Sequence, residues 1–431
     1  MRQPPESIVQ AYFVAAHVAL LSALAVVIWQ PWLLTEFYYQ PRTIAVVHLV
    51  TLGWITGSIL GALYALGPLA WRVEVPARRA DWIAFWVWLI SLSGMVVHFW
   101  IDEYNGMTWA AGTTLAAILM VGWRLVPLVA RAGIPTEHRL PVLLAVGNVS
   151  LAGTWGIALG LQKMGLVAIP GPPLGAVYAH MHLAALGWVL MMIFGAGYRL
   201  LPMFLPAAMP RGTAARVPVV LLQAGVLVLA IGLTLGHSRV SLAGAVLVVG
   251  AVAAFLRLVV GMLRNRLDLP IDMPRPDLAL PPTVLAVGYL VLSAVAGSTL
   301  LLLDNEVAAL RIGALYGVLG ILGFLAQFIV GIAGRLLPLT FWTQEFVRGG
   351  YEFLAVPLHQ LPDRRLQMMT VAGWALGVPL IAAGVWLARP QLVRVGAGVL
   401  LVGALGDAAN RVVAQRRAQA RLRREAPGAE G

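Results

Sequence analysis

The chain contains no cysteine and little charge. Without cysteine, disulfides, thiolate metal sites and a cysteine nucleophile are all excluded. Asp, Glu, Lys and Arg make up only 11% of the 431 residues, and Lys163 is the sole lysine. A water-soluble globular chain of this length needs far more charge on its surface. These absences indicate a protein whose solvent is lipid.

Long apolar runs take the place of the missing charge. Hydrophobic residues make up 60% of the chain, and the mean hydropathy is +0.85. Runs of roughly 20 residues are long enough to cross a hydrocarbon core of about 30 Å as helices, in which every backbone group finds its partner internally. We predict an all-α membrane protein of about twelve transmembrane helices. They lie near residues 9–34, 43–70, 81–101, 107–130, 141–161, 174–206, 216–236, 240–263, 281–303, 308–338, 368–388 and 391–412.

The arginines predict the topology. They gather on alternate connections, such as 72–79 and 131–139, while the opposite side carries acids such as Asp102 and Glu103. The positive-inside rule places the arginine-bearing loops in the cytoplasm. We therefore expect a multi-pass protein of the bacterial inner membrane with both termini cytoplasmic. The net charge of +12 then reflects topology and lipid contact rather than a nucleic-acid partner.

We expect residues 1–431 to form a single polytopic membrane domain, with no soluble domain inserted. The longest connection is predicted at 339–367, too short to fold by itself. Residues 413–431 should form a basic cytoplasmic tail that contacts anionic headgroups.

A sequence pattern recurs three times. Residues 48–68, 182–202 and 318–338 align without a gap, and each has Gly before Trp or Phe, a second Gly seven residues after the aromatic, and Pro fourteen residues after it. The aligned segments fall on the second, sixth and tenth helices. The repeats, at about 9–130, 141–263 and 281–412, predict three pseudo-symmetric four-helix arcs. Many carriers instead repeat at half the chain.

Five histidines lie near the outer ends of predicted helices: His48, His98, His180, His182 and His237. Ionisable residues inside a membrane are costly and commonly functional. His48 and His182 hold the same place in two of the repeats. Each histidine could bind a haem or metal ion, or simply hydrogen-bond a neighbouring carbonyl. His17 in the first helix is predicted to be a packed polar contact, and His138 and His359 to be solvated in cytoplasmic loops.

Residues 179–206 resemble the haem-bearing helix of the haem–copper oxidase subunit I superfamily. The shared features are His180-x-His182, Gly195, Pro202 and Phe204. That family also has twelve helices in three arcs, and the resemblance implies haem b, with copper as a second cofactor. Other respiratory-chain subunits or a cytochrome are then the expected partners.

The sequence also departs from that family. The His-x-His pair belongs to the family's tenth helix but lies here on the sixth, and the tenth has Tyr316 and Val318 instead. Only His237 stands where the family has adjacent copper-binding histidines, and helices 6 to 8 lack internal Lys, Glu or Asp. The pattern is similar in plan to the NnrS family of haem- and copper-containing proteins linked to nitric oxide, although Leu183 follows His182 where that family has Glu.

The resemblance leads to a specific hypothesis. One haem b lies near the outer face between His48 and His182, and His180 serves a second haem or binds copper with His237 or His98. Copper and haem iron both accept neutral imidazole. We expect respiratory electron transfer or nitric oxide and gas handling by an oxidoreductase without the full oxygen-reducing ligand set. The alternatives are a small-molecule or metal-ion transporter, and a non-catalytic subunit or assembly factor of a respiratory complex.

Overall fold

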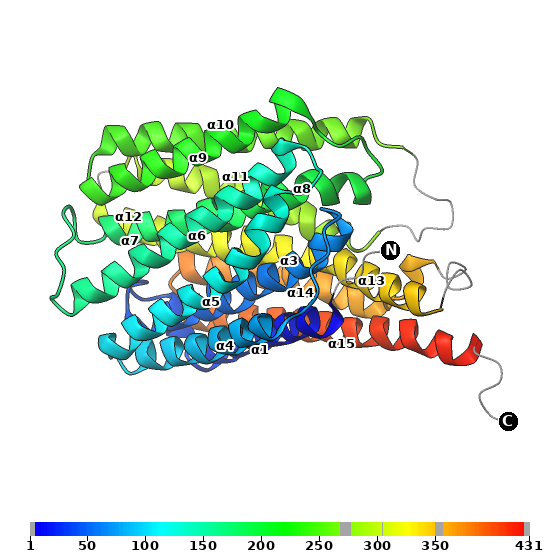
Figure 1. Ribbon diagram of the computed structural model, residues 1–431. Helices are drawn as coiled ribbons and strands as arrows, with labels where there is room; N and C mark the ends of the chain where they lie inside the picture. Colours follow the sequence, from blue (N-terminus) through cyan, green and yellow to red (C-terminus); the bar gives the residue numbers. More distant parts are fainter. Residues whose placement is uncertain (1–4, 268–276, 304, 350–356, 426–431) are drawn as a thin grey trace. The chain divides into compact units, whose positions relative to one another are not determined.

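The computed structural model describes residues 5–267, 277–303, 305–349 and 357–425, and every regular element in these ranges is helical (Figure 1). Twelve helical segments of the described chain are long and apolar enough to cross a membrane. The prediction of an all-α protein with twelve membrane helices is confirmed, and most ends agree with the predicted ones within a few residues.

Nine of the spans consist of one helix each. They are α1 (Glu6–Trp29), α4 (Arg79–Trp100), α5 (Tyr104–Ala130), α6 (Thr136–Lys163), α9 (Gly212–Leu235), α10 (Ser238–Arg264), α11 (Leu280–Leu300), α14 (Arg364–Trp386) and α15 (Pro390–Glu425). Short 3₁₀ turns, η1 (Pro31–Leu34) and η6 (Leu358–Gln360), lie in the connections.

The other three spans are composite, because each contains an internal π-helix. The second joins α2 (Pro41–His48), η2 (Leu49–Thr56) and α3 (Gly57–Leu69). The sixth joins α7 (Gly175–His182), η3 (Leu183–Leu190) and α8 (Met191–Phe204). The tenth joins α12 (Glu306–Val318), η4 (Leu319–Ala326) and α13 (Gln327–Gly349).

The prediction of a long connection at 339–367 is wrong for residues 339–349, which are helical. The prediction ended the tenth helix at Pro338, but α13 continues through this proline to Gly349 and carries Glu345, which is buried. Proline costs less in a membrane helix, where neighbouring groups compensate the lost hydrogen bond. The described part of the connection begins at residue 357.

The chain divides into two compact units. Unit 1 comprises Met1–Ala65, Ile271–Ala296 and Asn305–Gly431, and unit 2 comprises Leu66–Pro270 and Gly297–Asp304. In unit 1, α1 packs against η2 and α15, and α14 packs along α15. In unit 2, α4, α5 and α6 pack in sequence, α6 also contacts η3 and α8, and α9 pairs with α10.

The second glycine of each repeat marks a close helix crossing. At Gly61 and Gly195 an added Cβ would lie 3.0 Å from Tyr12 Cβ and 2.9 Å from a Val142 methyl carbon, respectively. At Gly331 it would overlap Thr283. In each case the partner belongs to the first helix of the same repeat, so the repeated glycines place equivalent helices in close contact.

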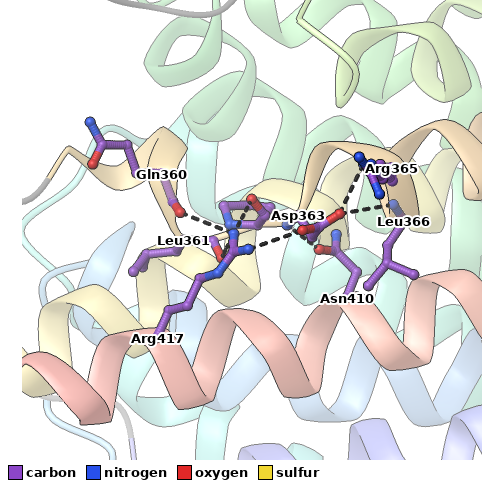
Figure 2. Close-up of polar contacts among 8 residues, drawn as sticks. Gln360, Leu361, Asp363, Arg365, Leu366, Asn410 and Arg417 are labelled. Atoms are coloured by element: carbon purple, nitrogen blue, oxygen red, sulfur yellow. Dashed lines mark hydrogen bonds and ion pairs between the residues drawn. The ribbon is translucent and has the colours of Figure 1, made fainter.

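The last helix extends beyond the membrane. With 36 residues, α15 is about 54 Å long, far more than a hydrocarbon core of about 30 Å requires. Arg417, on its extension, donates to the carbonyl oxygen of Pro362 (2.9 Å) and to the Asp363 carboxylate (2.9 Å), while Asn410 Oδ1 accepts from the Asp363 backbone N–H (2.7 Å) (Figure 2). The extension thereby fixes the start of α14.

Asp363 also caps α14. Its carboxylate accepts hydrogen bonds from the backbone N–H groups of Leu366 and Arg365, and these, with Arg417, hold the pKa of Asp363 below its usual value. Because the folded-state pKa is lowered, this stabilisation is present above the unfolded-state pKa and is lost as the pH falls through the folded-state value. It is therefore complete at neutral pH.

The contact between α14 and α15 depends on glycine. A Cβ on Gly373 would overlap the Cα of Gly403, whereas Gly398 on the same α15 has open space around it. We expect Gly373→Ala to lower the free energy of unfolding by about 1–3 kcal/mol, because the two backbones would have to separate. Reversible unfolding in detergent measures this, with Gly398→Ala as the control. Equal stability of both variants would contradict this packing.

Candidate functional site

Three π-helices occur in the described chain, all at the same place in the repeat. Each is eight residues long and begins directly after the aligned positions His48, His182 and Val318. π-helices are rare and are found mainly at functional sites. Because the three π-helices lie at aligned positions, the repeat is present in the backbone as well as in the sequence. This part of the second, sixth and tenth spans is therefore the candidate functional region.

Glycine occupies the fifth position of each π-helix: Gly53, Gly187 and Gly323. An added Cβ on Gly187 would lie 2.9 Å from Asn148 Cβ, and one on Gly323 would lie 2.6 Å from Tyr289 Cγ. Asn148 and Tyr289 are on α6 and α11, the first helices of their repeats. Glycine in the wide turn thus lets a side chain of the neighbouring helix approach the backbone.

His48 and His182 have the same local geometry at the start of their π-helices. His48 Nδ1 lies 2.9 Å from the Ile44 carbonyl oxygen, and His182 Nδ1 lies 2.7 Å from that of Tyr178, one turn back. A carbonyl oxygen only accepts, so Nδ1 carries the proton in both rings. In the neutral imidazole the lone pair is then on Nε2, the form of histidine that binds a metal. His48 belongs to unit 1 and His182 to unit 2.

His180 makes a different contact, as its spacing predicts. Its Nδ1 donates to the Ala152 carbonyl oxygen on α6 (2.9 Å), and an added Cβ on Gly156 would lie 2.9 Å from its Cε1. Gly156 therefore makes room for the His180 ring on α6, whereas His182 bonds within its own span. Two residues apart on a helix, the side chains point in different directions.

His98 and His237 complete the predicted set. His98 Nδ1 donates to the Gly94 carbonyl oxygen (2.7 Å), and its Nε2 lies 3.7 Å from Glu103 Oε2. His237 is exposed and directly precedes α10. Among the residues that the structure describes, no three His, Asp or Glu side chains are grouped to hold a metal ion. The copper ligand set remains a prediction.

The prediction that His138 is solvated is wrong. His138 is buried in the first turn of α6, and its Nε2 donates to the Pro210 carbonyl oxygen (2.8 Å). The predicted loop is shorter than expected, because α6 begins at Thr136. Neighbouring Glu137 accepts a hydrogen bond from the Gly212 N–H (2.8 Å) and fixes the same connection. His138 is therefore structural.

The sequence does not predict an amide pair beside η3, of which Asn148 is buried and Gln223 half-buried. Asn148 on α6 and Gln223 on α9 hydrogen-bond each other reciprocally at 2.8 and 3.1 Å, and Asn148 also donates to the Gly187 carbonyl oxygen at 2.9 Å. A π-helix disturbs the regular hydrogen-bond ladder, and here a side chain supplies a donor to it. The sequence feature that could have revealed this pair is the presence of Asn148 and Gln223 within membrane helices, where most residues are apolar.

We expect Asn148→Leu to destabilise unit 2 by about 1–3 kcal/mol, because Gln223 and the Gly187 carbonyl lose a buried partner. The double variant Asn148→Leu, Gln223→Leu should cost less than the sum of the single changes, since the two amides are coupled. Unfolding in detergent measures each free energy. Thr154→Ala, at an exposed position of α6, is the control. If the changes in unfolding free energy of the two single variants add up to that of the double variant, the two amides are not coupled and this interpretation is wrong.

Comparisons with known proteins support the fold. No protein-family model and no curated protein matches the chain. Among solved structures, it is similar to a chain of a haem–copper terminal oxidase dimer determined by cryo-EM, with a TM-score of 0.57 and 13% identity over 95% of this chain and 84% of that chain. At this identity the likeness shows the fold alone. The protein is thus a multi-pass membrane protein with a haem–copper oxidase-like fold.

Proposed function

We propose that the protein is a haem-binding membrane protein of the oxidase subunit I type and that His48 and His182 are ligands of haem b. Its role would be respiratory electron transfer or the handling of nitric oxide or another gas. The observation that carries this proposal is the shared geometry of the two histidines, each at the start of a π-helix with Nδ1 bonded to a backbone carbonyl.

These residues fit a haem. A histidine that ligates haem iron does so as the neutral imidazole, and a hydrogen bond from Nδ1–H both fixes the ring and makes Nε2 a stronger donor. The Ile44 and Tyr178 carbonyls supply that bond. Haem would supply one-electron transfer. The third repeat has Val318 at this place, so its span would contribute packing rather than a ligand.

Copper is the second proposed cofactor. His180 has its Nδ1 bonded to the Ala152 carbonyl, which presents Nε2 as a ligand atom, and His237 or His98 would join it. Within the same proposal, respiratory subunits or a cytochrome supply electrons, and the similar oxidase is described as a dimer. We also propose that the protein belongs to an NnrS-like branch, and the support for this is its sequence pattern alone.

His48→Ala and His182→Ala should each abolish the reduced-minus-oxidised haem spectrum of the purified protein. His359→Ala is the control, because His359 lies in η6, outside the membrane spans, and has no part in the proposed haem and copper sites. All three variants should insert into the membrane at the wild-type level. A wild-type spectrum in both site variants, or a wild-type protein without haem after expression with ample haem supply, would reject this function.

The proposed orientation places both termini in the cytoplasm. Residue 75 lies in an arginine-bearing connection, and residue 104 starts α5 after an acidic turn. Reporter fusions should give a cytoplasmic signal after residue 75 and a periplasmic signal after residue 104. The reverse pair of signals would overturn the orientation.

A further inference from the structure

Unit 1 buries a histidine at the middle of a membrane helix. His17 is 5% exposed and is the twelfth of the 24 residues of α1. Facing it, α15 contributes Asp407 and Arg411, both within the part of α15 that is apolar enough to span a membrane. Three ionisable side chains thus meet inside the bilayer, where each is costly. The haem proposal uses none of them.

One carboxylate oxygen connects the three side chains. Asp407 Oδ2 lies 2.6 Å from Arg411 Nη2 and 3.4 Å from His17 Nε2. The first distance is that of a strong charge-assisted hydrogen bond. The second lies within ion-pair range but lacks the geometry of a good hydrogen bond. His17 Nε2 therefore lies next to the Asp407 carboxylate but does not form a hydrogen bond with it.

Aromatic side chains lie against Arg411 and His17. The Arg411 guanidinium lies 5.5 Å from the ring centre of Phe13 and 5.8 Å from that of Trp54, and the His17 ring meets Trp54 edge to face at 4.8 Å. Rings at these distances stabilise a positive charge. Trp54 is the repeated aromatic residue of the first repeat and belongs to η2, so the motif itself forms one wall of the cluster.

Several polar atoms of this cluster have no hydrogen-bond partner among the described residues. They are both ring nitrogens of His17, Nε and Nη1 of Arg411, and Nε1 of Trp54. Buried polar atoms are nearly always paired with protein or with ordered water. The cluster therefore has polar atoms in addition to those that form the Asp407–Arg411 pair, and they leave room for a further hydrogen bond.

Charge explains why the ligand is a proton. The opposite charges of Arg411 and Asp407 neutralise each other, so the ion pair needs no third charged group. Replacing such a buried pair by apolar residues often leaves the free energy of folding unchanged. His17 adds an imidazole, the side chain whose unperturbed pKa lies closest to neutral pH. Asp407 and Arg411 are the charged side chains that act on His17. Of the elements packed on α1, η1 and η2 carry no ionisable side chain, and α2 carries Arg42 and His48.

We propose that His17, Asp407 and Arg411 form a proton-binding site in the membrane interior. His17 takes a proton from water at Nε2, and the new N–H donates to Asp407 Oδ2, which then pairs with both His17 and Arg411. The carboxylate stabilises the added charge, and the faces of Phe13 and Trp54 keep Arg411 in place. The site does not require haem, so it can be tested whether or not the proposed function holds.

The experiment uses the full-length protein in lipid nanodiscs with ¹⁵N-labelled histidine. His17→Gln identifies the His17 resonances by their loss. In the wild type these resonances should change from the neutral to the protonated form between about pH 8 and about pH 5, the range in which histidine titrates. Asp407→Asn should remove this change, and Asp407→Glu should restore it. Arg394→Gln, a charge loss elsewhere on α15, should leave it unaltered.

Two results would overturn the proposal. One is a His17 resonance that stays neutral throughout this pH range in the wild type. The other is a His17 titration that Asp407→Asn leaves unchanged. Asp407→Glu distinguishes the two reasons why Asp407→Asn could remove the titration. If Asp407→Glu restores it, the carboxylate is what matters, because a substitution that merely disturbed α15 would not restore it.

Discussion

The structure depends on one constraint: inside lipid, each backbone N–H and C=O must find a partner within the protein. Regular helices satisfy it for most of the twelve spans. The π-helices η2, η3 and η4 depart from the regular ladder, and at η3 Asn148 donates a hydrogen bond to the Gly187 carbonyl. Such departures persist where a function or a close contact requires them.

A similar constraint governs the histidines of the membrane spans. The Nδ1 atoms of His48, His98, His180 and His182 all donate to backbone carbonyls, which fixes the tautomer and the ring orientation. His17 differs, because neither of its ring nitrogens has such a bond. Four rings thus have a fixed tautomer with Nε2 as the basic nitrogen, while the Nε2 of the fifth lies 3.4 Å from the Asp407 carboxylate. This difference supports ligation at some positions and proton binding at another.

The sequence predicts the helices well, because the apolar runs report directly on the bilayer. It fails where tertiary contacts decide. The sequence predicts a helix end at Pro338, but α13 continues past it, and it predicts a solvated His138, whose Nε2 instead donates to the Pro210 carbonyl oxygen. The π-helices, which fall at one place in the repeat, were not predicted, because hydropathy does not distinguish a π-turn from an α-turn. The pairing of His17 with Asp407 and Arg411 joins residues nearly 400 positions apart, which one sequence does not reveal.

The central claim is that neutral imidazoles at the starts of two π-helices hold a haem. Electron paramagnetic resonance of the oxidised, purified protein tests it most directly, because the spectrum reports the axial ligands of haem iron. Two histidines with Nδ1 bonded to carbonyls predict a low-spin spectrum typical of two imidazole ligands. A purely high-spin spectrum, or no haem signal from a protein produced with ample haem, would contradict the account.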